Sequence, residues 1–297
     1  MMELERDRQV ISEPFSSVFS PDDKGIVEDT AVHAHTMFSI GWVMLAAKQM
    51  NIPVRVSHAH SALIDGKSIV KSLYESVMRS LILAYSTDLV ACGEKAGERL
   101  YGKKAYKKRA NLILNGINTE IFRFSEEKRN TIRQQLNLQD KFVIGHTGRL
   151  AEVKNQSFLI ELMPEILKKR DNAVLLLLGD GDDREMLEEK VGALNLKDKV
   201  IFAGSVCNVQ DYLSAMDVFV FPSLYEGMPL SILEVQANAL PCVISDTVPP
   251  DVFLTDLIHP LSLNDSREKW IETIISVKRN NWKNYPQELK NAGFDTQ

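Results

Sequence analysis

Short apolar runs alternate with stretches of helical hydrophobic period along most of the chain, most regularly in its second half. The apolar runs, which we expect to be strands, cover residues 142–146, 173–178, 200–203, 218–221 and 242–245. Helical patterns separate them at 156–170, 183–194, 209–216 and 230–239. The second apolar run ends in four consecutive leucines, which is typical of a strand covered on both faces. This alternation predicts a parallel, doubly wound sheet.

The same alternation, less complete, runs through the first half. Expected strands cover 29–35, 54–57, 88–92 and 110–114, and expected helices cover 41–50, 67–85 and 94–100. The apolar side of the helix over 67–85 is expected to consist of Ile69, Val70, Leu73, Val77, Leu81 and Ile82. A charged connection over 118–140, with a helix at 126–136, separates the halves. We therefore predict an α/β chain of two doubly wound, Rossmann-like domains, residues 1–125 and 126–297, that face a cleft.

Composition and charge narrow the classes of partner. With 297 residues the chain is long enough for two domains with cores of their own. A net charge of −5 argues against nucleic acid as the main partner. Cys92, Cys207 and Cys242 are far apart, with no C-x-x-C and no histidine at metal-ligand spacing, which indicates a reduced, cytoplasmic protein. No apolar run approaches the roughly 20 residues that span a bilayer, and residues 1–20 lack the apolar core of a signal peptide.

The first candidate for chemistry is the stretch 224–234, which follows an expected strand and opens a helix. Gly227 allows close approach of a ligand to the backbone, and Pro229 suits the first helical position. Free amides at a helix start bind phosphate, and Glu226 and Glu234 can each accept hydrogen bonds from sugar hydroxyls. The arrangement suits a nucleotide sugar. The alternative is ordinary helix-start chemistry, in which Pro and Glu are both common.

A basic pair follows another strand of the same half. The run 145–154 leaves a strand and enters a helix, and it carries Arg149 and Lys154. Arg149 can direct two donors at phosphate oxygens, and Lys154 adds a point charge. Together they could neutralise a diphosphate that leaves with added charge. The alternative is a pair of solvated surface cations.

These motifs, in their order, resemble those of a known family. They are Gly148-Arg149-Leu150 with Lys154, Leu178-Gly179-Asp180-Gly181, Phe202-Ala203-Gly204, Asp217 to Ser223, Glu226-Gly227-Met228-Pro229 with Glu234, and Pro241-Cys242-Val243. The same order is found in the family 4 (GT4) glycosyltransferases, which are retaining enzymes of the GT-B fold. The resemblance covers residues 142–246 densely and is closest to bacterial exopolysaccharide and capsule glycosyltransferases.

The resemblance implies roles for the four charged residues. Arg149 and Lys154 match the family's diphosphate-binding pair. Glu234 matches the carboxylate on the donor ribose, and Glu226 matches the one that holds the donor sugar.

It also implies roles for the backbone. The amides around Gly227, Met228 and Leu230 would face the diphosphate, and residues 204–208 would meet the base. The family mostly works without a metal, and no Asp-x-Asp motif stands at a plausible position here, so we expect neither metal nor cofactor.

Histidines supply the candidates in the first half. In the family a histidine after a strand faces the cleft near the reacting centre, and His58 and His60 both match it. Because side chains alternate along a strand, these two would point the same way, with Ala59 opposite. We favour His58 slightly; the alternative is that both are loop histidines bonded to backbone. His33 and His35 are interpreted as strand-end or acceptor-side residues.

The resemblance predicts a hexosyltransferase that moves a sugar, expected to come from a UDP-sugar, to a glycan or lipid-linked glycan with retention. The family's first strand and glycine-rich loop have no counterpart before residue 30, and its last crossover helix is expected to begin at 291–295, so we expect a shortened chain with an incomplete first domain. Two alternatives stay open: an inactive nucleotide-sugar-binding or scaffold subunit, and a nucleotide-sugar epimerase. The basic tract 103–109 is either a solvated face or a peripheral contact with anionic lipid at the inner face of the membrane.

Overall fold

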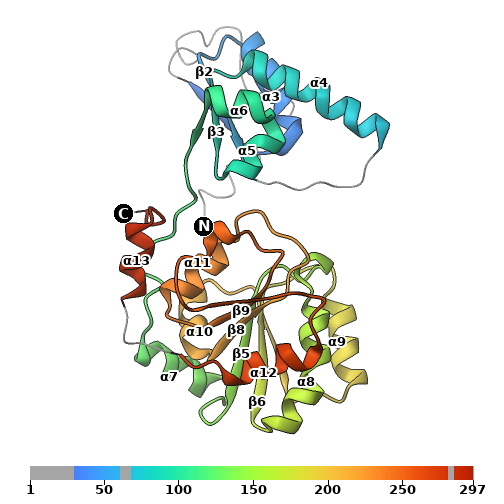
Figure 1. Cartoon of the computed structure of the whole chain (residues 1–297), viewed down its shortest axis with the longest axis vertical. Helices are drawn as coiled ribbons and strands as arrows, with labels where there is room; N and C mark the ends of the chain where they lie inside the picture. The colour runs from blue at the N-terminus through green and yellow to red at the C-terminus, as the bar shows by residue number, and fades with distance from the viewer. Residues whose placement is uncertain (1–29, 61–67, 280–283, 297) are drawn as a thin grey trace. The chain divides into compact units, whose positions relative to one another are not determined.

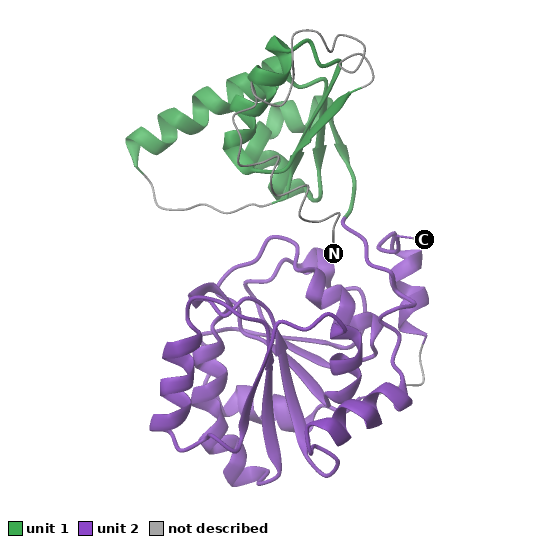
Figure 2. Cartoon of the chain, turned by 180° about the vertical axis from the view of Figure 1, so that it is seen from behind, with its two compact units in different colours: residues 1–114 green, residues 115–297 purple. Residues whose placement is uncertain are grey.

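The computed structural model describes residues 30–60, 68–279 and 284–296. It divides into two compact units, residues 1–114 and 115–297 (Figure 2). Each unit is a parallel sheet with helices around it (Figure 1), so the predicted α/β class is confirmed. The N-terminal segment before residue 30 and the start of the predicted 67–85 helix at Lys67 lie outside the described residues.

The first unit is built on a sheet of strand order β1-β2-β3-β4, all parallel. Its strands are β1 (Ala31–Ala34), β2 (Val54–Ala59), β3 (Asp88–Ala91) and β4 (Ala110–Leu112). Its helices are η2 (Met37–Ser39), α3 (Ile40–Gln49), α4 (Ile69–Tyr85), α5 (Glu94–Tyr101) and α6 (Lys103–Arg109). The basic tract is thus itself the short helix α6, whose Lys and Arg side chains are exposed.

Helix α4 corrects one sequence prediction. Its apolar side was expected to pack, but Ile69, Val70 and Leu73 are 90%, 77% and 67% exposed. The buried residues of α4 are Met78 and Ile82, in its C-terminal half. That half packs closely on α3, because Gly41 has no side chain where an added Cβ would lie 2.9 Å from the Met78 carbonyl oxygen. The N-terminal half extends beyond the sheet (Figure 1).

The second unit has a parallel sheet of strand order β10-β9-β8-β5-β6-β7. Its strands are β5 (Phe142–Thr147), β6 (Ala173–Leu178), β7 (Val200–Gly204), β8 (Val218–Phe221), β9 (Cys242–Ser245) and β10 (Ile258–Leu261). Its helices are α7 (Glu126–Gln135), η3 (Glu152–Lys154), α8 (Gln156–Lys169), α9 (Arg184–Ala193), α10 (Val209–Ala215), α11 (Leu230–Ala237), η4 (Pro250–Val252), α12 (Arg267–Ser276) and α13 (Tyr285–Asn291). Among the described residues, none of the helices combines the length and the apolar character needed to cross a membrane.

The order of the second sheet locates its ligand-binding edge. Strand β5 pairs with β6 on one side and with β8 on the other. The order in which successive strands are added to the sheet therefore reverses at β5. Every residue of β5, β6 and β8 is buried, as the apolar runs predict. Open α/β sheets bind ligands beyond the carboxyl ends of the strands at such a switch point.

The first unit ends at Leu114, before the predicted boundary at 125/126. Residues 115–125 pack with the second unit: Ile117 bridges Asp295, and the Phe122 carbonyl accepts a 2.8 Å hydrogen bond from Asn238. Helix α7 is held there as well, because Arg129 and Arg133 each donate to the Asp217 carboxylate at 2.6 Å.

The C-terminal prediction is wrong. No helix begins at 291–295; helix α13 ends at Asn291, and the chain turns at Gly293 with a φ of +85°. A glycine in that conformation commonly terminates a helix. The following residues return to pair with Ile117.

Candidate functional site

Backbone hydrogen bonds join the carboxyl ends of β5, β6 and β7. The Gly148 amide donates to Leu178 at 3.0 Å, and the Gly179 amide donates to Gly204 at 2.8 Å. Gly179 is required here, because its φ is +124° and an added Cβ would lie 2.1 Å from the Gly148 carbonyl oxygen. Gly148 and Gly179 therefore hold the loop after β5, which carries Arg149, against the loop after β6.

The loop after β5 also contacts the loop after β8. Lys154 Nζ lies 2.7 Å from Glu226 Oε1, and the two side chains are 21% and 11% exposed. The ammonium also lies 5.0 Å from the centre of the Phe221 ring. The structure thus brings together the predicted donor-binding residue Lys154 and the predicted catalytic residue Glu226 at the switch point, as a largely buried ion pair.

Arg149 has a different partner. Its guanidinium pairs with Asp182, and the two side chains are 66% and 83% exposed. Exposed pairs of this kind contribute about 0–1 kcal/mol, so a ligand anion can replace Asp182 at little cost. No contact between Arg149 and Lys154 or Glu226 is found among the described residues.

Two buried side chains for which no role was predicted hold the loop after β5 in place. His146 is fully buried, and its Nδ1 lies 2.9 Å from the Val220 carbonyl oxygen. Burial lowers the pKa of His146 to about 4, so the ring is neutral at pH 7. Gln156 Nε2 donates to the Arg149 carbonyl oxygen at 2.8 Å and lies 3.3 Å from His146 Nε2. A buried polar pair flanking the Arg149 to Lys154 run is the signal that could have revealed them.

Helix α11 begins at Leu230, as the 230–239 pattern predicts, but Pro229 is not the first helical residue. Pro229 is its N-cap, with φ −74° and ψ 108°, and Leu230 is the first helical residue. In the part of the chain that the structure describes, no side-chain hydrogen bond caps the start of the helix. Gly227 and Met228 form the half-buried turn before it. The backbone arrangement therefore keeps the character of an anion seat, although the proline was placed in the wrong position.

Glu234 lies in the middle of α11 among buried neighbours. Burial raises the pKa of its carboxyl to about 7, and no hydrogen bond or ion pair to it is found within the described part of the chain. Glu234 is itself half-buried, and a carboxyl without a partner in such surroundings is costly unless a ligand supplies donors. This property fits a carboxylate that accepts hydrogen bonds from ligand hydroxyl groups, which is the role that the resemblance implies.

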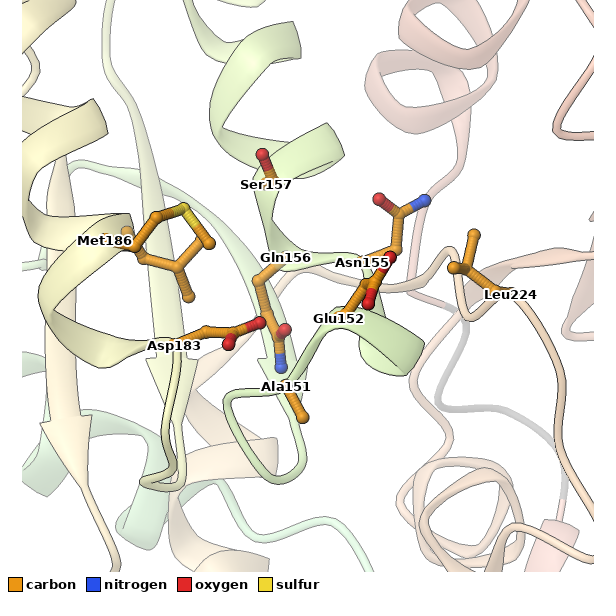
Figure 3. Close-up of a pocket in the computed structure, with 9 residues that line it drawn as sticks. Ala151, Glu152, Asn155, Gln156, Ser157, Asp183, Met186 and Leu224 are labelled. Atoms are coloured by element: carbon orange, nitrogen blue, oxygen red, sulfur yellow. The ribbon is translucent and has the colours of Figure 1, made fainter. Parts of the chain in front are cut away.

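A pocket of about 450 Å³ lies beside the same loop (Figure 3). It lies between the 151–157 segment, the start of α9 and the loop after β8, and it is lined by Ala151, Glu152, Asn155, Gln156, Ser157, Asp183, Met186, Leu187 and Leu224. None of the predicted donor-binding residues lines it. The pocket adjoins the site without containing it.

The histidines of the first unit form a cluster. The rings of His58 and His60 lie 4.0 Å apart, so they point the same way as predicted, while Ala59 is buried. Both rings contact a histidine of the neighbouring strand: His58 Nδ1 lies 3.1 Å from His33 Nε2, and His60 Nε2 lies 2.7 Å from His35 Nδ1. They are therefore not simply bonded to backbone.

Burial and repulsion between the neighbouring imidazoles lower the pKa of His58 to about 4. The pKa values of His35 and His60 are lowered for the same reasons, burial being the larger cause. These three rings are therefore neutral at pH 7, each with one N–H and one nitrogen that has a free lone pair.

Comparisons with known proteins identify the family. The model of the family "Glycosyl transferases group 1" matches residues 128–295, so the chain belongs to this family. EpsF of Bacillus subtilis (strain 168), which is classed as a glycosyltransferase, is 36% identical over 90% of this chain and 72% of its own length. The predicted glycosyltransferase family is confirmed.

A second relative and a solved structure extend the comparison. The Escherichia coli UDP-Gal:alpha-D-GlcNAc-diphosphoundecaprenol alpha-1,3-galactosyltransferase is 29% identical over 72% of this chain and 57% of its own length. The crystal structure of Anabaena Alr3699/HepE in complex with UDP aligns with a TM-score of 0.73 and 20% identity, over 88% of this chain and 73% of that one. The GT-B fold that the motifs predict is confirmed.

Proposed function

We propose that the protein transfers a hexosyl group from a UDP-sugar to a hydroxyl of a glycan or lipid-linked glycan, in the cytoplasm, during bacterial surface polysaccharide synthesis. The observation that carries the proposal is the largely buried Lys154–Glu226 pair at the switch point of a parallel sheet. Two similarities support it: the Escherichia coli relative is named for a UDP-Gal donor and a diphosphoundecaprenol acceptor, and HepE was solved with UDP and with UDP-glucose.

In the proposed reaction the bond between the anomeric carbon and the diphosphate oxygen breaks, and its electron pair leaves with UDP. The acceptor oxygen bonds to the anomeric carbon on the same face, so configuration is retained, and the hydroxyl proton is released. Arg149, Lys154 and the start of α11 neutralise the departing diphosphate, with no metal or cofactor assigned to the step. Glu226 would hold the sugar and Glu234 the ribose.

A thermal-shift screen with UDP, GDP, ADP and their sugars tests the donor assignment. We expect UDP and UDP-sugars to give the largest shifts. Glu234→Ala should reduce the shift for UDP and UDP-sugars alike, whereas Glu226→Ala should reduce it mainly for UDP-sugars, because only these carry the group that Glu226 holds. Equal shifts in the wild-type protein and both variants would remove the carboxylates from the site. Binding without sugar transfer or donor hydrolysis would indicate a binding subunit, and conversion of the donor without an acceptor would indicate an epimerase.

We assign His58 and His60 to transfer and not to donor binding. Replacing His58 with glutamine should lower kcat by about 10²-fold, as loss of one polar group near the reacting centre does, and leave the UDP-induced thermal shift unchanged. The fall in kcat of His60→Gln measures how much the His60 ring contributes to transfer. Transfer at the wild-type rate in both variants would contradict the assignment.

We propose peripheral contact with anionic lipid through α6 and the exposed apolar side chains of α4. Lys103, Lys104, Lys107, Lys108 and Arg109 are exposed on α6, and each basic residue near an anionic surface contributes about 1 kcal/mol. The protein should co-sediment with vesicles rich in phosphatidylglycerol at low salt, and Lys107→Glu/Lys108→Glu should lose this. Failure of the wild-type chain to co-sediment would refute the contact.

A further inference from the structure

Four of the six histidines of the chain gather on one face of the first sheet. His33 and His35 come from β1 and the residue after it, and His58 and His60 from β2 and the residue after it. The register pairs Ala34 with Ser57, which places the two strand ends side by side. Because alternate residues share a face, the four rings meet.

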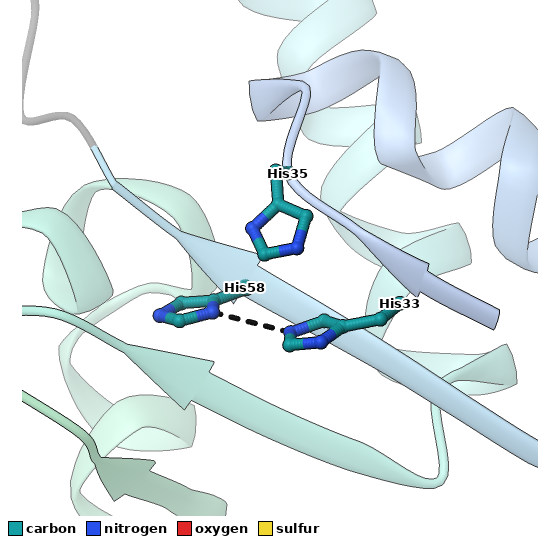
Figure 4. Close-up of side chains that lie close together, drawn as sticks. All are labelled: His33, His35 and His58. Atoms are coloured by element: carbon teal, nitrogen blue, oxygen red, sulfur yellow. Dashed lines mark hydrogen bonds between the residues drawn. The ribbon is translucent and has the colours of Figure 1, made fainter. Parts of the chain in front are cut away.

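The nitrogens of this histidine cluster lie close enough together to share a ligand. His33 Nε2 lies 3.1 Å from His58 Nδ1, with the two rings nearly parallel (Figure 4). One nitrogen from each of His33, His35 and His58 lies within 4.8 Å of the others. Two imidazoles bound to one Zn²⁺ at about 2.0–2.1 Å, in tetrahedral geometry, have nitrogens about 3.3 Å apart. Small side-chain rotations would therefore suffice.

His58 supplies an independent sign of an unfilled role. The side chain is 7% exposed, and its Nε2 has no hydrogen-bond partner among the described residues. Buried polar atoms usually have one. The other nitrogen, Nδ1, has His33 as its partner, and no backbone group within the described ranges bonds to either nitrogen.

We propose that His33, His35 and His58 bind a divalent transition-metal ion of the Zn²⁺, Co²⁺ or Ni²⁺ kind. Imidazole nitrogen suits these ions, whereas Mg²⁺ and Ca²⁺ require oxygen ligands. His60, at 2.7 Å from His35 Nδ1, orients that ring and leaves its other nitrogen for the metal, as outer hydrogen-bond partners do at metal sites. The site belongs to the first unit and is independent of the proposed diphosphate site.

The test uses the full chain without a histidine tag, stripped with a chelator and then titrated with CoCl₂. We expect a single Co²⁺ per chain with the intense visible ligand-field bands of a nitrogen-rich tetrahedral site, displaced by ZnCl₂ and unaffected by MgCl₂. His33→Gln/His35→Gln should abolish the bands, and His60→Gln should weaken Co²⁺ binding by about 10–100-fold. His259→Gln, in the other unit, should bind as the wild type does.

His33 and His35 are exposed, so their double variant should fold even if His58→Gln does not. Circular dichroism and the unfolding midpoint of the metal-free proteins check this. Absence of binding to the wild type, or equal Co²⁺ affinity in the wild type and in a folded His33→Gln/His35→Gln variant, would overturn the proposal.

Discussion

Lys154→Ala is expected to lower the rate of sugar transfer by about 10²–10³-fold, the usual effect of removing one group that stabilises developing negative charge. In the free protein the ammonium lies 2.7 Å from Glu226, in surroundings where both side chains are mostly buried. Electrostatic interactions are stronger there than in water, so a diphosphate that gains charge as it leaves would draw the same ammonium strongly. The measurement is single-turnover transfer with saturating UDP-sugar.

The same substitution leaves Glu226 without its cation, so stability must be separated from catalysis. Loss of one partner of a buried pair costs about 3–5 kcal/mol, less here because the pair retains some exposure. Lys154→Ala/Glu226→Ala should therefore recover part of the unfolding midpoint lost in Lys154→Ala without recovering the rate. Lys168→Ala, on the exposed side of α8, is the matched control and should change neither. A Lys154→Ala rate within threefold of wild type would exclude the proposed role.

The strands and helices with a regular apolar pattern could be predicted because the pattern within each segment indicates which of its residues are buried. The leucines of β6 and the apolar residues of β8 are buried on both faces, and their sequence alone indicates this. The Lys154–Glu226 contact follows once the strands are placed, since the carboxyl ends of neighbouring parallel strands share one edge.

What could not be predicted depends on tertiary neighbours. Strand β10 contains Pro260, which argues against a strand, yet β10 is an edge strand, where a proline is tolerated. The exposure of Ile69 and Leu73 follows from how far α4 extends past α3, which no periodicity encodes.

The histidine cluster was missed for a related reason. Metal motifs are recognised by spacing along the chain, whereas His33 and His58 lie 25 residues apart and meet only through strand register.

Glu234 should make donor affinity depend on pH in a direction that its burial sets. The pKa of its carboxyl is raised to about 7, so most molecules carry a neutral carboxyl at pH 6 and a carboxylate at pH 8. Ribose hydroxyls donate best to the carboxylate, so binding should favour the ionised form and release a proton below pH 7. The affinity for UDP-glucose should therefore rise about tenfold from pH 6 to pH 8. UDP-glucose is preferable to UDP for isothermal titration, because it lacks a terminal phosphate that titrates near pH 6.

Glu234→Gln is the matched variant, and it tests folding and binding in opposite directions. Its affinity should be weak and nearly independent of pH. In the free protein, a carboxyl with a raised pKa contributes most to stability below its unfolded value of 4.5, and this contribution is lost as pH rises through 7. The glutamine should therefore raise the unfolding midpoint at pH 8, by about 2–4 °C for each kcal/mol relieved, but not at pH 4. If replacing Glu234 stabilises the free protein and weakens ligand binding, the carboxyl serves binding and not folding. A flat pH profile in the wild-type protein would show instead that Glu234 does not meet the ribose.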